Sequence, residues 1–416
     1  SPPHSAPVRR GGAHARRYNR AMHGSDAFDA AASFRPEAND RPTRIRVDLD
    51  ALSHNFHALQ AHAGVPVMGI VKANAYGHGL VPVARHLQAQ GIGQLGVALV
   101  EEGIALRRAG VTVPILVMGG IHAPQVGQFL ACDLEVTVSS IAKLRQVEQA
   151  AASLGRQAVI HLKVDTGMER IGVHSENAGP LIEAAVASRW CTVKGIYSHL
   201  ACSDDPASPM THEQRHRFLD ACRHFDRIGA PMPLRHLANS GGVLHFPDTC
   251  LDMVRPGIAL YGVMPDPASR ATVALKPALS LVSQVVYFNV VKAGRTVSYG
   301  ATWTAPADTR VVTVPIGYGD GYPRSLSSRG EVLVRGQRRP IIGRVCMDQF
   351  MVDLGPGGTA YNEDEVVLIG AQGDDAISCE AVAHAAGTIP YEILTGLNAR
   401  IPREYVGGAS SGGPAA

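Results

Sequence analysis

Residues 65–80 read VPVMGIVKANAYGHGL, and this stretch organises the rest of the chain. An apolar run from 65 to 71 ends at Lys72 and then breaks into asparagine, glycine and histidine. A run of that length with an abrupt polar end predicts a buried strand that delivers Lys72 to a loop. Gly77 and Gly79 lack a Cβ, so we expect the backbone there to turn tightly or to approach a ligand closely. From the strand and the lysine alone, a surface lysine after a core strand is the more common interpretation.

Apolar runs of strand length recur as far as residue 258, and helical patterns such as LVPVARHLQAQ (80–90) lie between most of them. The eight runs are 65–72, 95–100, 115–119, 134–139, 158–164, 193–198, 234–238 and 252–258. Strands that alternate with helices in this way predict an α/β fold, a (β/α)8 TIM-type barrel.

A barrel of this kind carries its functional groups at the carboxyl ends of its strands. Polar side chains stand at the ends of several runs: Lys72, Lys163, Asp165, His199, Asn239, Ser240 and Arg255. Loops are polar in any protein, so one such residue would mean little. Two lysines, a histidine and an arginine on one face favour a functional site there.

After about residue 275 the pattern changes to short β-type runs separated by glycine and proline. The expected parts are a disordered basic tail at 1–42, a barrel domain at 43–275, a mainly β domain at 276–406 and a flexible tail at 407–416. The strand expected at 45–50 can pair with the C-terminal domain. Asp50 is expected to cap a helix through 52–61.

The composition, 45% hydrophobic and 18% charged, is ordinary for a soluble globular protein, and a net charge of +3 is weak evidence for a nucleic-acid partner. We expect no membrane-spanning helix, because eighteen consecutive apolar residues occur nowhere, and the basic opening lacks the apolar segment of a signal peptide. Seven cysteines without CxxC spacing favour reduced thiols over a disulfide scaffold or a zinc site. These features predict a cytoplasmic protein without a metal ion.

The segment VKANAYGHG (71–79) resembles the cofactor-lysine motif of pyridoxal-phosphate-dependent alanine racemases. Further motifs of that family follow in its order: HLKVDTGMERIG (161–172), NSGG (239–242), RPGIALYG (255–262), VSYGATW (297–303) and RVCMDQF (344–350). The resemblance covers about residues 43–406. It implies a racemase that interconverts L-alanine and D-alanine and supplies D-alanine for cell-wall peptidoglycan. The implied mechanism uses two bases on a pyridoxal 5'-phosphate Schiff base, in a homodimer whose subunits share their active sites.

The cofactor phosphate has candidate ligands in the loops after the seventh and eighth strands, where TIM barrels commonly bind phosphate. Ser240 offers a hydroxyl, and Gly257 and Ile258 offer backbone amides. By itself, NSGG is more often only a turn. The resemblance adds Tyr76 and Tyr391 as phosphate ligands.

The cofactor ring and the proton transfers follow from the same resemblance. It implies that Arg255 faces the ring nitrogen, and because arginine stays charged and accepts no hydrogen bond, that nitrogen stays unprotonated. It also implies Lys72 as the base on one face of the substrate and Tyr299, from the partner subunit, on the other. A free tyrosine has a pKa near 10, so a cation must favour its phenolate, and His199 with Arg255 behind it is the implied relay. Without the resemblance, Tyr299 is an ordinary strand-end core residue.

Lys163 matches a lysine that the family carries as a carbamate, which would hold Arg170 against the cofactor and the substrate. A Lys163–Asp165 ion pair is the alternative. The family commonly has glycine where this chain has Glu169, which places an extra charge beside Arg170.

The β-domain supplies the remaining candidates. Met347 matches a residue whose backbone amide binds the substrate carboxylate. Tyr318 and Arg324, in GYGDGYPR (317–324), resemble gate residues, although a glycine- and proline-rich turn is the alternative. A narrow gate would favour a side chain as small as methyl.

Three other functions compete with alanine racemisation. A barrel-plus-β decarboxylase of basic amino acids shares the fold and the lysine, but is not expected to combine SYG, CMD and DTGMxR. A racemase of serine or of several amino acids is the second. A non-catalytic regulatory protein that carries the cofactor is the third, and the long β-domain with Tyr299 disfavours it.

Overall fold

A curved parallel sheet forms the first half of the molecule, and its strand order follows the sequence. Its strands are β2 (Met68–Ile70), β3 (Gln94–Val97), β4 (Ile115–Val117), β5 (Glu135–Val138), β6 (Ala158–Asp165), β8 (Cys191–Tyr197) and β9 (Leu234–His236), with the short β7 (Val173–His174) beside β6. The computed structural model describes residues 40–265 and 272–408, and the tails expected before residue 40 and after 408 lie outside them.

The ring of strands is closed at the position of the eighth run. Met253 forms a parallel bridge to His236 of β9, and Val254 forms one to Val67, next to β2. The amide of Met68 donates to the carbonyl of Val254 at 2.8 Å. The prediction of a (β/α)8 barrel is confirmed.

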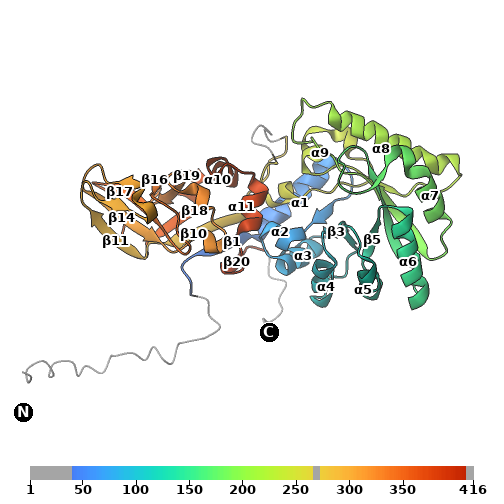
Figure 1. Ribbon diagram of the computed structural model, residues 1–416, viewed down its shortest axis with the longest axis horizontal. Coiled ribbons are helices and arrows are strands. Elements are labelled where there is room, and N and C mark those ends of the chain that lie inside the picture. Colours follow the sequence, from blue (N-terminus) through green and yellow to red (C-terminus); the bar gives the residue numbers. More distant parts are fainter. Residues whose placement is uncertain (1–39, 266–271, 409–416) are drawn as a thin grey trace, which may run out of the picture. The chain divides into compact units, whose positions relative to one another are not determined.

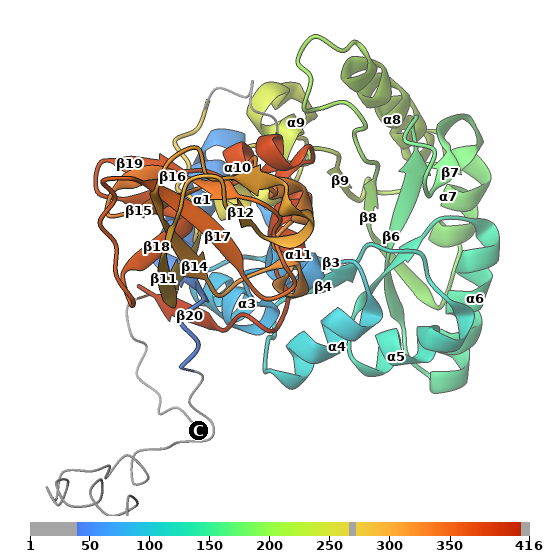
Figure 2. The same ribbon diagram turned by 60° about the vertical axis from the view of Figure 1, so that its left-hand side comes forward.

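Amphipathic helices follow the strands and cover the outside of the barrel (Figures 1 and 2). They are α3 (Leu80–Ala89), α4 (Val100–Arg108), α5 (Val126–Ala131), α6 (Ile141–Leu154), α7 (Ala178–Val186), α8 (Met210–Arg227) and the short α9 (Ser240–His245). In α6 the buried residues Leu144, Val147 and Ala151 recur at helical spacing, which makes one face of the helix apolar.

The first helix, α1 (Leu49–Ala63), begins earlier than expected. Its N-cap is Asp48, whose side chain accepts a hydrogen bond from the amide of Ala51 at 2.9 Å. The cap falls on Asp48 because this last residue of β1 keeps an extended backbone, which an N-cap requires. Asp50 lies in the first turn and accepts a hydrogen bond from the amide of Gly408 instead.

A second, mostly antiparallel sheet forms the C-terminal half in the order β11-β14-β17-β16-β15-β18-β10-β1-β20, with β19 beside β18. Its strands are β1 (Arg44–Asp48), β10 (Leu279–Gln284), β11 (Tyr287–Val291), β14 (Thr309–Val314), β15 (Glu331–Val334), β16 (Gln337–Ile342), β17 (Phe350–Gly355), β18 (Glu365–Gln372), β19 (Asp375–Ile377) and β20 (Arg403–Val406). A small hairpin, β12 (Thr296–Val297) with β13 (Trp303–Thr304), and two helices, α10 (Cys379–Ala386) and α11 (Pro390–Gly396), complete this half.

The N-terminal segment of the described chain belongs to this second sheet. Strand β1 pairs antiparallel with β10 and parallel with β20 before the chain enters the barrel. Arg41 binds Asp320 with two hydrogen bonds of 2.8 and 2.7 Å. These contacts tie the start of the described chain to the C-terminal half.

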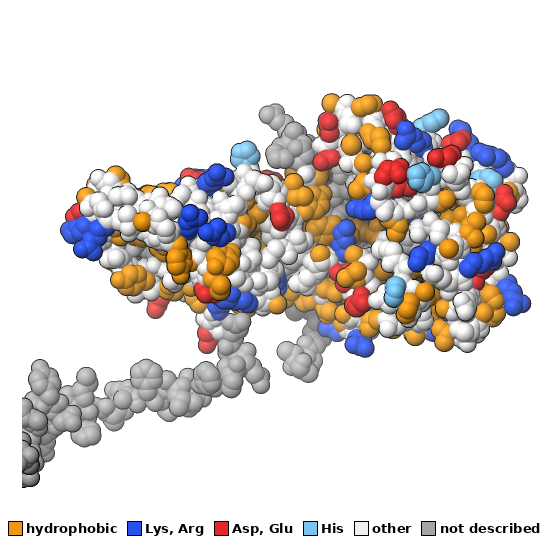
Figure 3. All heavy atoms as spheres, in the orientation of Figure 1, with side chains coloured by type: hydrophobic (Ala, Val, Ile, Leu, Met, Phe, Trp, Pro, Cys, Tyr) orange, Lys and Arg blue, Asp and Glu red, His pale blue; other side chains and the backbone are white. Residues whose placement is uncertain are grey.

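On the face shown in Figure 3, basic, acidic and hydrophobic side chains are interspersed. In the part of the chain that the structure describes, no helix is long and apolar enough to cross a membrane.

The two glycines of VKANAYGHG permit close contact between the barrel and the C-terminal half. Gly77 has φ +82°, and a Cβ there would lie 2.2 Å from the carbonyl oxygen of Leu394 in α11. Gly79 has φ +105°, and a Cβ would lie 1.9 Å from the hydroxyl of Tyr405 in β20. That hydroxyl donates to the carbonyl of His78 at 3.1 Å. The close approach expected at these glycines is thus made to the chain itself.

We expect Gly79→Ala to destabilise the protein more than Gly91→Ala. Both glycines have a positive φ, where an L-residue costs about 1–2 kcal/mol, but a Cβ at Gly91 would meet nothing within 4 Å. Overpacking against Tyr405 should add about 1–3 kcal/mol at Gly79. Thermal melting measures both losses, and the loss at Gly79 should shrink when Tyr405→Phe is also present. Equal losses at the two glycines would contradict this account.

Candidate active site

A cavity of about 810 Å³ lies at the carboxyl ends of the barrel strands, and residues of α11 form part of its wall. Ten of the predicted site residues line it: Lys72, Tyr76, Lys163, Arg170, His199, Ser240, Arg255, Gly257, Ile258 and Tyr391. The barrel brings nine of these residues together although they are far apart in the sequence, and α11 adds Tyr391.

Lys72 stands at the start of an unusual backbone turn. The segment α2 (Lys72–Tyr76) follows β2, and its residues 73–76 have φ between +51° and +56°, in the left-handed region. This conformation costs about 1–2 kcal/mol for each L-residue, so the surroundings must hold it. Glu102 accepts from the amide of Ala73 at 2.6 Å, and Asn74 accepts from the amide of Leu80 at 2.9 Å. We expected a loop here, and the structure shows a braced left-handed turn.

The environment favours the neutral amine of Lys72. Burial lowers the pKa of its ammonium group, the charges of Arg170 and Arg255 lower it further, and Glu102 opposes them. A neutral amine is the form of lysine that attacks a carbonyl group.

Arg255 is buried, and its terminal nitrogens are fully hydrogen-bonded. Nη1 donates to the carbonyl of His236 at 2.6 Å and to Nδ1 of the same residue at 3.1 Å. Nη2 donates to the carbonyls of Ser198, at 2.7 Å, and Leu237, at 3.1 Å. Burial lowers the pKa of Arg255 to about 10, while Tyr197 opposes that shift, so the group stays charged at neutral pH.

The fifth donor of Arg255 remains free. Its Nε is buried and has no hydrogen-bond partner among the described residues. A buried donor without a partner costs about 1–3 kcal/mol, so a ligand that accepts from it would recover that energy. An unprotonated pyridine nitrogen is an acceptor of this kind.

The hydroxyl groups of Ser240, Tyr76 and Tyr391 form a cradle in the cavity wall. Ser240 accepts at Oγ from the amides of Gly257, at 2.9 Å, and Ala259, at 3.2 Å, which leaves its own proton to donate. The amide of Gly257, expected to bind phosphate, is thus already bonded to Ser240. A Cβ at Gly257 would lie 2.3 Å from the hydroxyl of Tyr76, so this position requires glycine.

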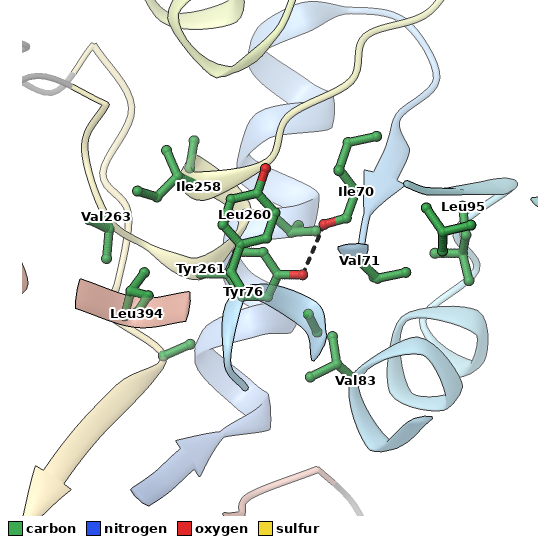
Figure 4. Close-up of a cluster of buried hydrophobic side chains, with 14 of the residues drawn as sticks. Ile70, Val71, Tyr76, Val83, Leu95, Ile258, Leu260, Tyr261, Val263 and Leu394 are labelled. Atoms are coloured by element: carbon green, nitrogen blue, oxygen red, sulfur yellow. Dashed lines mark hydrogen bonds between the residues drawn. The ribbon is translucent and has the colours of Figure 1, made fainter. Parts of the chain in front are cut away.

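Two tyrosines complete the cradle as proton donors. Burial raises the pKa of Tyr76, and the neighbouring Tyr391 raises it further. Burial and the charge of Asp204 raise the pKa of Tyr391 to about 12. Both phenols therefore keep their protons and can donate to phosphate oxygens. Figure 4 shows Tyr76 beside Ile258 and Tyr261, where the hydroxyl of Tyr261 donates to the carbonyl of Ile70 at 2.9 Å.

Lys163 is buried among cations. Burial, the charge of Arg255 and, more weakly, that of Arg170 lower the pKa of Lys163 to about 7, against the opposing charge of Asp165. Its Nζ lies 5.0 Å from the ring centroid of Tyr197.

Asp165 does not form the ion pair with Lys163 that was the alternative to a carbamate. The Asp165 carboxylate instead accepts from three backbone amides, those of Gly167 at 2.8 Å, Glu169 at 3.2 Å and Arg170 at 3.3 Å. Glu169 has φ +54°, a conformation that favours glycine, and its carboxylate lies 3.6 Å from His174. Its carboxylate thus lies beside the ring of His174.

His199 lines the cavity as a neutral ring. Burial, then the charges of Arg255 and Lys163, hold its pKa well below the usual value. Within residues 40–265 and 272–408 no hydrogen bond joins its side chain to Arg255. The histidine that hydrogen-bonds to the side chain of Arg255 is His236.

Four predicted residues do not line the cavity: Tyr299, Tyr318, Arg324 and Met347. They lie on the C-terminal half, where Tyr299 is 72%, Met347 53% and Tyr318 42% exposed. The amide of Tyr318 donates to the carbonyl of Cys346 at 3.1 Å, and that of Gly319 donates to Met347 at 2.8 Å. The loops of Tyr318 and Met347 are therefore adjacent.

Tyr197, His236 and Glu102 contribute to the site although sequence reasoning did not select them. Tyr197 and His236 are the last residues of β8 and β9, and their rings stack at 4.7 Å. Their position at strand ends was the available signal. Glu102 lies in α4, and its helical pattern gave no sign that it caps the turn after Lys72.

A lysine of lowered pKa beside a buried, charged arginine at a barrel mouth suits an enzyme that acts on carbonyl and anionic groups. Residues 47–265 match the family model "Alanine racemase, N-terminal domain", and residues 278–405 match "Alanine racemase, C-terminal domain". The chain belongs to the alanine racemase family.

Individual relatives agree with this assignment. The alanine racemase of Desulforamulus reducens is 40% identical over 370 residues, which cover 88% of this chain and 99% of that protein. The crystal structure of alanine racemase from D-cycloserine-producing Streptomyces lavendulae has a TM-score of 0.86 at 40% identity and covers 89% of this chain and 98% of that one. The crystal structure of alanine racemase from Bartonella henselae, with covalently bound pyridoxal phosphate, has a TM-score of 0.80 at 29% identity. It covers 88% of this chain and 99% of that one.

The chain is therefore an enzyme that interconverts L-alanine and D-alanine, and the supply of D-alanine to the cell wall follows from the family. The predictions of the family and its reaction are confirmed. The decarboxylase and the non-catalytic protein, weighed as alternatives, are not supported.

We expect Lys72 of the cofactor-free protein to react with amine reagents at a lower pH than an ordinary lysine, whose pKa is 10.5. A lowered pKa means that the neutral, reactive amine appears earlier as the pH rises. Competitive labelling with mass spectrometry, across a pH series, gives the midpoint. Glu102→Gln should lower that midpoint further, because Glu102 favours the ammonium form. A midpoint at 10.5 in both proteins would be incompatible with the described environment.

Proposed function

We propose that this chain racemises alanine with pyridoxal 5'-phosphate bound at Lys72, and that Lys72 and Tyr299 of a second copy are the two bases. The observation that carries the proposal is the free, buried Nε–H of charged Arg255 in the cavity that also holds Lys72. When bound, the cofactor supplies an electron sink for the bond between Cα and its hydrogen.

The residues of the cavity fit the two ends of that cofactor. The hydroxyls of Ser240, Tyr76 and Tyr391 and the amide of Ile258 would hold its phosphate. Arg255 would donate from Nε to its ring nitrogen and, being unable to accept, would keep that nitrogen unprotonated. An unprotonated ring is a weaker electron sink, which limits side reactions and suits a racemase.

Proton transfer on one face of the substrate falls to Lys72. Its lowered pKa makes the neutral amine, which can accept the proton from Cα and return it, more available than in an ordinary lysine. Racemisation also requires a base on the opposite face. The tyrosines that line the cavity, Tyr76, Tyr197 and Tyr391, all have a raised pKa and hold their protons, so they are poor bases.

The second base must then come from outside this cavity, and Tyr299 is the candidate. It is 72% exposed, and Tyr318 and Met347 are exposed on the same half of the chain. Large exposed apolar side chains of this kind are typical of interaction surfaces. In a homodimer this surface would meet the cavity of the partner, where Tyr318 and Arg324 would form the gate and the amide of Met347 would bind the substrate carboxylate.

Lys163 is proposed to carry a carbamate. With a pKa of about 7, much of it is the neutral amine that combines with CO₂, releasing one proton and leaving an anion. That anion would lie among cations, with Arg255 and Arg170 both close enough to shift the pKa of Lys163. Opposite charge at this position would compensate the buried cations and orient Arg170 toward the substrate.

Mixing Lys72→Ala protein with Tyr299→Phe protein should restore activity. Each homodimer lacks one base, and loss of a general acid–base group lowers the rate about 10²- to 10⁴-fold. If sites are shared in a two-fold dimer, each mixed dimer has one intact site, and an equimolar mixture should reach about a quarter of the original activity. Racemisation followed by optical rotation measures this. No regain, with subunit exchange verified by native mass spectrometry, would place Tyr299 outside the partner's site.

Labelling with ¹³C-bicarbonate should give a carbamate signal in the carbon NMR spectrum of the protein. Because only the neutral amine reacts and the pKa of Lys163 is about 7, the signal should grow as the pH rises through 7. Lys163→Met should abolish the signal, and the control Lys292→Met, at an exposed lysine paired with Asp308, should not. A signal that persists in Lys163→Met would assign the carbamate to another amine.

A further inference from the structure

A row of hydrogen bonds descends from Arg255 through the barrel interior. Nδ1 of His236 lies 3.1 Å from Nη1 of Arg255, and Nε2 of His236 lies 2.9 Å from Nδ1 of His161. Nε2 of His161 lies 2.9 Å from Oε2 of Glu135. Both histidines are fully buried, and Glu135 is buried at the amino end of β5, at the opposite end of the strands from the cavity.

The chemistry of Arg255 reveals the direction of the whole row. A guanidinium only donates, so Nδ1 of His236 must be the unprotonated nitrogen. Nε2 of His236 then carries the proton and donates to Nδ1 of His161, so the proton of His161 must lie on Nε2. That proton is donated to the carboxylate of Glu135. Each ring is therefore neutral and in its Nε2–H form.

The rings are held in place independently of these bonds. The ring of His236 stacks on Tyr197 at 4.7 Å with an interplanar angle of 8°. A Cβ at Gly195 would lie 2.3 Å from Nδ1 of His161, so the His161 ring fills the space that a side chain there would need. This packing limits how far either ring can tilt away from its hydrogen-bond partners.

Glu135 receives three donors at the end of the row. Oε1 binds the ammonium group of Lys194, and Oε2 accepts from His161 and from Nε2 of Gln94 at 2.5 Å. Burial raises the pKa of Glu135, but the hydrogen bonds and charges of His161 and Lys194 outweigh it, so the carboxylate stays ionised. An ionised carboxylate makes the hydrogen bond from His161 strong, and it carries no proton that would face the N–H of His161.

We propose that Glu135 is a positioning residue for the racemase: through His161 it fixes the tautomer of His236, and so keeps an acceptor in front of Arg255. Among the described residues no carboxylate pairs with Arg255. Backbone carbonyls hold its terminal nitrogens, and its one side-chain acceptor, His236, is connected through His161 to the anion of Glu135. This proposal rests on the proposed role of Arg255 at the cofactor ring. The ordinary alternative is that Glu135 and Lys194 form only a stabilising ion pair at the bottom of the barrel.

Substitutions at Lys194 distinguish a positioning role of Glu135 from a purely stabilising ion pair. In Glu135→Gln the ammonium group of Lys194 still requires an acceptor, so it draws the amide oxygen to itself. The amide NH₂ then faces Gln94 and His161. Gln94 can turn its own amide to present its oxygen, but His161 must accept at Nε2. The row reverses, and His236 presents Nδ1–H to the N–H of Arg255. In Glu135→Gln/Lys194→Met the amide is free to turn its oxygen to His161, so the original direction should return.

The test is a long-range ¹H–¹⁵N correlation spectrum of the cofactor-free protein, which distinguishes the two tautomers of His161 and His236. We expect Nε2–H forms in the natural protein and in Lys194→Met, Nδ1–H forms in Glu135→Gln, and Nε2–H forms again in the double variant. Pyridoxal 5'-phosphate affinity, measured by fluorescence titration, should fall about tenfold in Glu135→Gln, as for loss of a group that orients a ligand-binding residue, and recover in the double variant.

An Nδ1–H form of either histidine in the natural protein would overturn the proposal even if Glu135→Gln fails to fold. Unchanged tautomers in Glu135→Gln, or a reversed row that Lys194→Met does not restore, would also overturn it. The spectra are independent of catalysis. If the natural protein showed the expected tautomers but did not bind the cofactor, the proposed function would fail and the row would stand.

Discussion

The buried guanidinium of Arg255 is the constraint on which the site depends. A charge in the barrel interior is costly unless its donors are satisfied, and four of its five N–H groups bond to Ser198, His236 and Leu237. These acceptors lie at or just beyond the ends of β8 and β9, so the guanidinium fixes the two strand ends relative to each other. Burial lowers the pKa of Lys72, Lys163 and His199, and the charge of Arg255 lowers each of them further. One cation thereby positions the cavity wall and adds to the shift of its amines and its imidazole toward their neutral forms.

Sequence reasoning identified the barrel and most of the cavity because both depend on local pattern. Apolar runs with polar ends gave the strands and, with them, Lys72, Lys163, His199, Ser240 and Arg255. It did not identify the left-handed turn at residues 73–76, since those positions hold no glycine and the bracing carboxylate, Glu102, lies in another helix. It also passed over Tyr197 and His236, because an aromatic or histidine ring inside a strand has the pattern of an ordinary core residue. Which donor meets which acceptor is decided by packing between strands, and that information is not local.

The β-domain shows the opposite relation between motif and structure. Its motifs SYG, CMD and GYGDGYPR were recognisable, yet they lie outside the cavity of their own chain. Exposure of Tyr299, Tyr318 and Met347 is unfavourable for apolar side chains in water, so their position favours an interface. The cavity in turn lacks a tyrosine that could act as a base, because burial raises the pKa of those it contains. The exposed Tyr299 lies outside the cavity, and the cavity lacks a base that Tyr299 could supply. This match is the physical argument for sharing the site between two copies.

The stretch 65–80 links these halves. Lys72 faces the cavity, and five and seven residues later Gly77 and Gly79 lie against Leu394 and Tyr405 of the C-terminal half. Leu394 belongs to α11, the helix that carries Tyr391 into the cavity wall. A displacement of α11 would therefore act on both the proposed cofactor lysine and a proposed phosphate ligand. Because a Cβ at either glycine would clash with this contact, the spacing of lysine and glycines in one short motif connects the backbone around Lys72 to the contact between the β-domain and the barrel.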